Sequence, residues 1–361
     1  MSNSSFKNQL QARFAEEKFL CVGLDPRLNK IPSSLIKEIE EGLIEDADIR
    51  NMHPYKRHQL IAASAMAAFS MEIVGVTCDI VGAYKPNLAF WARYGKYGLD
   101  QLLAVIGMIR EEAPDVLIIL DAKEGDIDAT NEAYVDAYLR EIGLGVDAIT
   151  LHPYLGRETM APFLDLEDKG AIVLSRTSNK GAGEFQDLLT IEPDDFEPLP
   201  RLVVYTTLEE TIDKVMEWYE NLYAKTMPLF QRVAKNVAER WNEHGNCMLV
   251  AGATSPAEIG EIRKVAPNIS LLIPGIGAQG GDLNETVRYA MDSRGGGFLI
   301  NSSRGIIHAS SSEDFIESAR AAALQLHNQI NECRYKWMCK LDGAELADRL
   351  ISDTDGSGET A

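Results

Sequence analysis

Eight short, largely apolar runs recur along the chain, and segments of helical periodicity separate most of them. Each run is of strand length, and unbroken apolar runs of this length are typical of strands buried on both faces in a parallel sheet. The predicted strands lie at residues 19–25, 78–87, 115–120, 147–153, 171–177, 247–253, 269–274 and 297–301. Helices are predicted at residues 59–74, 99–112, 129–140, 158–168, 229–244, 255–265 and 312–330.

This alternation of strand and helix predicts a parallel α/β architecture. A closed (β/α)8 barrel, the TIM barrel, is the economical arrangement at this count, and an open, doubly wound sheet is the alternative. Charged or polar residues follow many of the predicted strands. They favour the barrel, because its strands all end on one face, where enzymes of this fold keep their sites. These residues are Asp25, Lys85, Asp121, Lys123, Ser178, Gln279 and Arg304.

Residues 1–330 are expected to form the barrel as a single domain. The alternation is interrupted after the fifth strand, where a Glu-, Asp- and Pro-rich stretch indicates an insertion at about residues 191–226. The polar, acidic segment at residues 32–57 reads as a connection with weak helical character. Residues 331–361 are expected to be a C-terminal appendage, and the composition of residues 353–361 is typical of disorder.

The end of the third predicted strand carries the densest group of charges. Asp121 and Lys123 are two residues apart, so on a regular strand they point the same way. Asp126 follows, and Thr130 lies on the first turn of the next predicted helix. In a barrel, Lys85 would flank Asp121 from the neighbouring strand, and each opposite charge would stabilise the next. A structural ion pair at a strand end is the plainer interpretation, whereas clusters of this kind are also common in active sites.

Two loops have the composition of a phosphate site. Pro274-Gly-Ile-Gly-Ala-Gln-Gly-Gly281 follows the seventh strand, and its glycines let backbone N–H groups approach a ligand. Asn301-Ser-Ser-Arg304 follows the eighth strand and offers a guanidinium that binds phosphate oxygens in a fork. Phosphate sites after strands seven and eight are frequent in this fold. Each loop taken alone is also compatible with an ordinary turn.

Hydroxyl and amide groups follow the fifth strand, at Arg176-Thr-Ser-Asn-Lys-Gly-Ala182. They suit hydrogen bonding to a neutral polar ring, and the alternative is a Ser- or Asn-stabilised turn.

His152 ends the fourth strand and is left out of the candidate site, because a lone histidine is more often structural. His, Asp and Glu show no spacing typical of a metal site, so no metal and no cofactor are expected.

Composition limits the kinds of partner that this protein is expected to bind. The 361 residues are 45% hydrophobic and 25% charged, and the formal net charge is −20. A protein this acidic is a poor candidate for binding nucleic acid or anionic membranes. The five cysteines are scattered, which favours a reducing compartment such as the cytoplasm. The N-terminal residues lack the apolar core of a signal peptide, and no run approaches transmembrane length.

Taken together, these motifs resemble the orotidine 5′-phosphate decarboxylase superfamily, whose Asp-x-Lys-x-x-Asp pattern matches residues 121–126. The similarity to its longer, bacterial-type decarboxylases covers roughly residues 18–330. It rests on Leu20-Cys-Val-Gly-Leu-Asp25-Pro, Tyr84-Lys-Pro-Asn87, Arg176-Thr-Ser-Asn179 and the two phosphate-type loops. The insertion, the acidic connection and the tail depart from a minimal family member, which leaves the domain edges and the assembly open.

The resemblance implies decarboxylation of orotidine 5′-phosphate to UMP in pyrimidine biosynthesis, without a cofactor. Lys123 would protonate C6 of the pyrimidine, within a charged row of Lys85, Asp121, Lys123 and Asp126. Asp126, Ile127 and Thr130 would complete the site of the neighbouring subunit in a homodimer. The remaining implied contacts are Asp25 and Lys85 to the ribose, Ser178 to the pyrimidine edge, and Gln279 and Arg304 to the phosphate.

Two alternatives stay open. The metal-dependent branch of the superfamily uses the same motif for chemistry on sugar phosphates, but it would need an acidic ligand where the second strand offers Lys85. A catalytically silent module that binds a pyrimidine nucleotide would be favoured by a broken row of charges, and here the row is complete.

Overall fold

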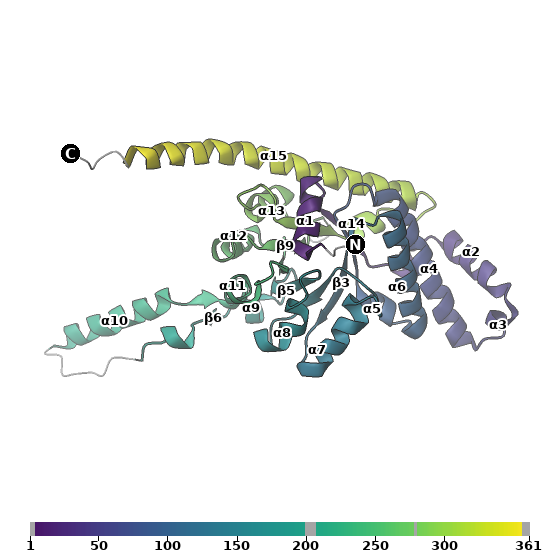
Figure 1. The fold of residues 1–361 in the computed structure, drawn as a ribbon, viewed down its shortest axis with the longest axis horizontal. Coiled ribbons are helices and arrows are strands. Elements are labelled where there is room, and N and C mark those ends of the chain that lie inside the picture. Colours follow the sequence, from purple (N-terminus) through teal and green to yellow (C-terminus); the bar gives the residue numbers. More distant parts are fainter. Residues whose placement is uncertain (1–3, 199–206, 278–279, 356–361) are drawn as a thin grey trace.

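The computed structural model describes residues 4–198, 207–277 and 280–355, with the backbone alone for residues 208 and 341–355. Eight parallel strands close into a barrel, which confirms the (β/α)8 prediction and rules out the open sheet (Figure 1). Each strand overlaps one predicted run. In barrel order the strands are β1 (Leu20–Leu24), β10 (Phe298–Ser302), β9 (Ser270–Pro274), β8 (Cys247–Ala251), β5 (Gly170–Arg176), β4 (Ala148–Leu151), β3 (Leu117–Glu124) and β2 (Ala83–Pro86).

Helices surround the barrel and cover its apolar outer side. One of them, α4 (Pro54–Thr77), is long and apolar enough to cross a membrane by length and composition, although 61% of its most apolar 18-residue stretch is buried. It packs against α6 and α15. The other surrounding helices are α6 (Gly95–Glu112), α7 (Asp128–Tyr134) with the π-turn η2 (Val135–Leu139), α8 (Arg157–Leu164), α11 (Leu229–Asn236) with the π-turn η4 (Val237–Trp241), α12 (Pro256–Val265), α13 (Leu283–Ala290) and α15 (Phe315–Asp355).

Helix α1 (Phe6–Ala15) packs near the N-terminal ends of the strands. Its Phe6 and Phe14 rings are buried, and a Cβ atom at Gly170, the first residue of β5, would lie 2.5 Å from the Phe6 ring. Phe14 also stacks on Phe19, with ring centroids 5.2 Å apart. The end of the barrel opposite the polar strand ends is therefore filled by apolar side chains.

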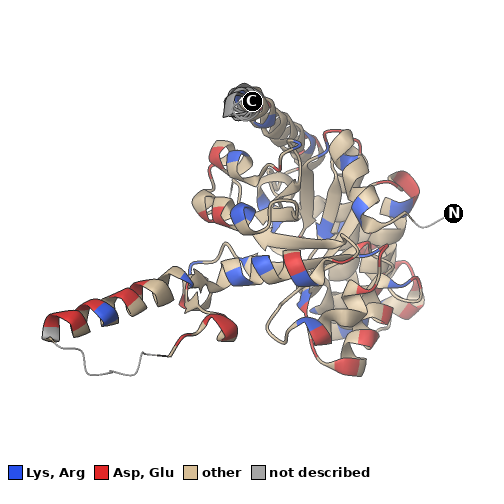
Figure 2. Ribbon diagram, turned by 60° about the vertical axis from the view of Figure 1, so that its left-hand side comes forward, with Lys and Arg blue, Asp and Glu red and all other residues tan. Residues whose placement is uncertain are grey.

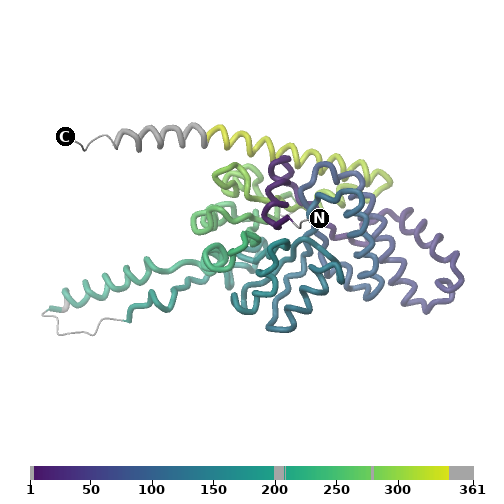
Figure 3. The backbone as a smooth tube through the Cα atoms, in the orientation of Figure 1, coloured from purple at the N-terminus to yellow at the C-terminus, as the bar shows by residue number. Residues whose placement is uncertain are grey.

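The acidic connection is more helical than its sequence predicts. It contains α2 (Ser33–Ile44) and α3 (Ala47–Arg50), and α4 then begins at Pro54. In Figure 3 this part of the chain and the insertion after β5 leave the barrel on opposite sides.

The insertion forms a projecting arm. Strands β6 (Leu189–Thr190) and β7 (Met227–Pro228) pair antiparallel at its base, and helix α10 (Leu208–Ala224) runs along it. Much of the ribbon of this helix is red in Figure 2, the colour of Asp and Glu. Glu192 anchors the base, accepting hydrogen bonds from Arg232 at 2.5 Å and from Arg240 at 2.9 Å.

The helix predicted to end at residue 330 does not end there. Helix α15 is a single element of 41 residues that continues through the expected appendage as far as Asp355. Residues 356–361 lie outside the described part of the chain. Arg334 fixes the middle of the helix, donating to the Gly295 carbonyl at 2.7 Å and lying over the Phe19 ring.

Candidate active site

A cavity of about 530 Å³ opens at the C-terminal ends of the barrel strands. Polar side chains from most of the strand ends line it, together with a few apolar ones such as Leu174 and Val250. Of the residues predicted for the site, it is lined by Asp25, Lys85, Asp121, Lys123, Ser178 and Arg304.

Asp121 is the centre of the charged group. Its Oδ2 atom accepts hydrogen bonds from Lys85 Nζ at 2.7 Å and Asn87 Nδ2 at 3.3 Å. Its Oδ1 atom accepts from Thr150 Oγ1 at 3.1 Å and from Lys123 Nζ. Four donors thus hold the two carboxylate oxygens, which fixes the direction in which the carboxylate points.

The buried pair of Asp121 and Lys85 is charged at neutral pH. Burial by itself raises the pKa of Asp121, but Lys85 and Lys123 outweigh it and hold that pKa well below its usual range. Burial likewise lowers the pKa of Lys85, but the carboxylates of Asp121 and Asp25 outweigh it and raise that pKa. Removing one partner of a buried ion pair strongly destabilises the folded protein, because the other charge is left buried without a partner. Asp121 and Lys85 are therefore best probed by isosteric substitutions.

Lys123 differs from Lys85 in exposure. The Lys85 side chain is 6% exposed, whereas the Lys123 side chain is 49% exposed and lies at the cavity. Regular strand alternation does not explain its position, because β3 leaves its register with β4 after Leu120 and Lys123 has a φ of +56°. The prediction that Asp121 and Lys123 point the same way assumed a regular strand. The two side chains do lie together, but an irregular backbone brings them there.

Asp25 follows β1 at the side of the cavity. Its Oδ1 atom is buried and has no hydrogen-bond partner among the described residues. Buried polar atoms in folded proteins are nearly always paired, so this oxygen has the properties of a ligand contact. Gly23 lets β1 approach the loop after β10, because a Cβ atom there would lie 1.8 Å from Ser303 Oγ.

The two phosphate-type loops meet at the same cavity. Gly275 and Ile276 line it from the loop after β9, and Gly275 has a φ of +113°, which favours glycine. Arg304 lines it from α14 (Arg304–Ile307), with an exposed side chain that forms no ion pair with another described residue. Gln279 lies outside the described residues.

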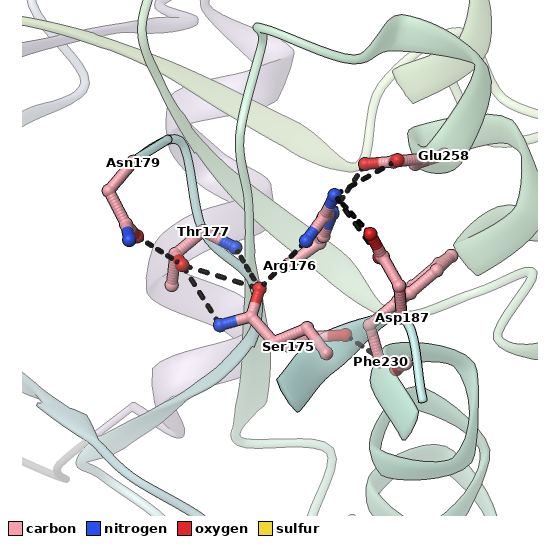
Figure 4. Close-up of polar contacts among 8 residues, drawn as sticks. Ser175, Arg176, Thr177, Asn179, Asp187, Phe230 and Glu258 are labelled. Carbon is pink, nitrogen blue, oxygen red and sulfur yellow. Dashed lines mark hydrogen bonds and ion pairs between the residues drawn. The ribbon is translucent and has the colours of Figure 1, made fainter. Parts of the chain in front are cut away.

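The loop after β5 is held by a polar network (Figure 4). Ser178 lines the cavity, and Gln186 of α9 (Gly183–Gln186) fixes the preceding residue, accepting from Thr177 N at 2.9 Å. Arg176 does not line the cavity. It forms ion pairs with Glu258, at 2.5 Å from its Nε atom, and with Asp187, at 3.2 Å from its Nη2 atom. The network connects the loop to the base of the arm.

Three predicted site residues do not line this cavity: Asp126, Ile127 and Thr130. Asn131 holds the backbone of Asp126, accepting from its N–H at 2.9 Å and donating to its carbonyl at 2.5 Å. Ile127 is 52% exposed, and Thr130 is exposed as well. His152 supports the same loop through a hydrogen bond of 3.0 Å between its Nε2 and the Gly125 carbonyl.

Sequence reasoning missed Thr150 and Gln186. Thr150 lies within an apolar run and is 2% exposed, and the available signal was a single hydroxyl in an otherwise apolar strand. Gln186 lies in a segment whose fold was not predicted. Among the described residues, no group of three or more His, Cys, Asp and Glu side chains is arranged to hold a metal ion.

Comparison with known proteins gives one consistent result. Residues 18–195 match the model of the orotidine 5′-phosphate decarboxylase / HUMPS family. An orotidine 5′-phosphate decarboxylase from an Azoarcus strain is 38% identical over 331 residues, which cover 91% of this chain and 99% of that protein. One from a Janthinobacterium strain is 36% identical over 329 residues, or 91% and 98% of the two chains. The structure of Leishmania donovani OMP decarboxylase superimposes with a TM-score of 0.66 at 29% identity, over 92% of this chain and 99% of that one.

Proposed function

The chain belongs to the orotidine 5′-phosphate decarboxylase family, and we propose that it converts orotidine 5′-phosphate to UMP and carbon dioxide, a step of pyrimidine biosynthesis. The observation that carries the proposal is the unbroken row Lys85–Asp121–Lys123 at the mouth of the barrel, beside a cavity lined by Ser178 and Arg304.

Lys123 is the acid in the proposed reaction. Loss of carbon dioxide from C6 leaves a carbanion that the pyrimidine ring stabilises poorly. An ammonium at C6 stabilises this charge as it develops and then supplies the proton, so its contribution is greatest at the transition state. Its exposure at the cavity, in contrast to the buried Lys85, supports this assignment.

Asp121 is assigned to the neighbourhood of the leaving carboxylate. Its low pKa keeps it ionised, and its four hydrogen-bond donors keep it from turning away. A fixed negative charge beside the substrate carboxylate raises the energy of the bound ground state, and this repulsion is relieved as carbon dioxide leaves.

The rest of the cavity is assigned to binding. Asp25, with its unpaired buried oxygen, and Lys85 suit the ribose hydroxyls, and Ser178 suits the edge of the pyrimidine. Arg304 and Gln279 are assigned to the phosphate. Binding energy from the phosphate, remote from C6, positions the ring and is used in the transition state.

Asp126, Ile127 and Thr130 are assigned to the active site of a second subunit, in a homodimer with shared sites. These three residues do not line the cavity of their own chain, and Ile127 and Thr130 are exposed, which supports this assignment.

We also propose a cytoplasmic enzyme, because all five cysteines are free, as in a reducing compartment.

The first test concerns metal dependence. Purified protein should consume orotidine 5′-phosphate at the same rate in EDTA as with added Mg²⁺, measured by the loss of substrate absorbance. A strict requirement for a divalent ion would instead place the chain in the metal-dependent branch. Binding of UMP without any turnover would support the silent nucleotide-binding alternative.

A second prediction concerns Arg304. Arg304→Ala should lower kcat/KM. The loss of transition-state stabilisation calculated from this fall should be at least about 2 kcal/mol, the scale of a hydrogen bond between charged groups. The loss should be far smaller with orotidine, which lacks the phosphate, and that substrate serves as the internal control. Equal losses on the two substrates would contradict the phosphate assignment.

A further inference from the structure

The catalytic end of β3 is an irregular segment, and one residue of β4 lies opposite it. Strands β3 and β4 pair regularly up to Leu120 with Ile149, and pairing resumes at Glu124 with Leu151. Between these pairs, the segment Asp121–Lys123 of β3 faces Thr150 alone. A bulge of this kind removes residues from the ladder of backbone hydrogen bonds and bends the strand.

The Thr150 hydroxyl replaces the ladder that the bulge interrupts. Its Oγ1 atom accepts from Ala122 N at 3.0 Å and from Lys123 N at 2.9 Å. The same hydroxyl donates to Asp121 Oδ1 at 3.1 Å. One buried side chain therefore contacts every residue of the bulge, namely the carboxylate of Asp121 and the backbone N–H groups of Ala122 and Lys123.

The conformation held in this way is a costly one. Lys123 has a φ of +56°, in the left-handed region that side chains other than glycine seldom adopt. Such a backbone conformation is energetically unfavourable and persists only where its surroundings impose it. With its N–H bonded to Thr150 and its Nζ to Asp121, Lys123 is held in this geometry at both ends.

We propose that Thr150 is a positioning residue for decarboxylation, acting through the bulge to aim Lys123 and Asp121 at the reacting carbon. This inference rests on the proposed function. Thr150 lines the cavity beside these two residues, but its hydroxyl is already engaged in three hydrogen bonds, so it acts through them and does not contact the substrate.

The test compares Thr150→Val, which keeps the shape and removes the hydroxyl, with Thr150→Ser, which keeps the hydroxyl. Misplacing a reacting group by about 1 Å costs on the order of 100-fold. We expect kcat of Thr150→Val to fall by about that factor, with KM and the Kd for UMP within about threefold of wild type. Thr150→Ser should restore most of kcat. Steady-state kinetics, UMP titration and thermal melting provide the readouts.

Several outcomes would overturn the proposal. They are an unchanged kcat in Thr150→Val, equal losses in the Val and Ser variants, or UMP affinity falling in step with kcat, which would indicate a general structural role. If Thr150→Val does not fold, Thr150→Cys replaces it, because a thiol is a weak acceptor of similar size, and the same comparison with Thr150→Ser applies. A wild-type protein that fails to decarboxylate orotidine 5′-phosphate would instead contradict the proposed function.

Discussion

Lys123→Ala is expected to lower kcat by more than about 10⁴-fold while leaving the fold intact. Proton delivery by a positioned acid contributes roughly 10²–10⁴-fold. The substitution also removes the cation nearest to the developing charge, which adds a further electrostatic loss. Single-turnover decarboxylation of orotidine 5′-phosphate measures the effect, and UMP binding and melting report the integrity of the site.

The neighbouring lysine should not rescue this variant. Lys85 is buried, and Asp121 holds its ammonium at 2.7 Å, so it lacks the freedom to move to C6. A matched control is Lys264→Ala, which removes an exposed lysine of α12 that pairs with Glu261 outside the cavity. This control should retain activity within about threefold, because isolated surface pairs contribute little. A Lys123→Ala variant with a comparably small loss would remove Lys123 from the role of acid.

Much of the fold follows from local patterns. The strands of a parallel barrel are buried on both faces and read as apolar runs, so β8 and β9 are visible in the sequence. The site was predictable for a related reason: residues at strand ends, such as Asp25 and Arg304, are brought together by topology alone.

The parts that were missed depend on contacts distant in sequence. Helix α10 projects with Ile212, Met216, Tyr219 and Tyr223 exposed, so its apolar positions do not report burial in the core. The last helix was predicted to end at residue 330, but α15 continues to Asp355, and no local signal in the sequence marked this end. The bulge at Lys123 requires the hydroxyl of Thr150 from the neighbouring strand, and alternation along β3 carries no information about that partner.

Mixing two nearly inactive variants, Lys123→Ala and Asp126→Ala, should restore activity to about a quarter of the wild-type level. If Asp126 serves the partner's site, a mixed dimer has one site with both lesions and one with neither, as a two-fold interface requires. Random reassortment makes about half of the dimers mixed, and each contributes one intact site. The Asp126→Ala variant should fold, because the Asn131 side chain bonds to the backbone of Asp126 and not to its carboxylate.

The matched control mixes Lys123→Ala with Asp121→Asn. Both positions lie on β3 of one chain and line the same cavity, so every site of a mixed dimer carries one lesion and no activity should return. Exchange of subunits is verified with differently tagged chains before the assay, and decarboxylation is then measured against total protein. If Lys123→Ala and Asp126→Ala restore nothing under conditions of proven exchange, Asp126 acts within its own chain. The exposed surface around Ile127 would then need another explanation than a shared active site.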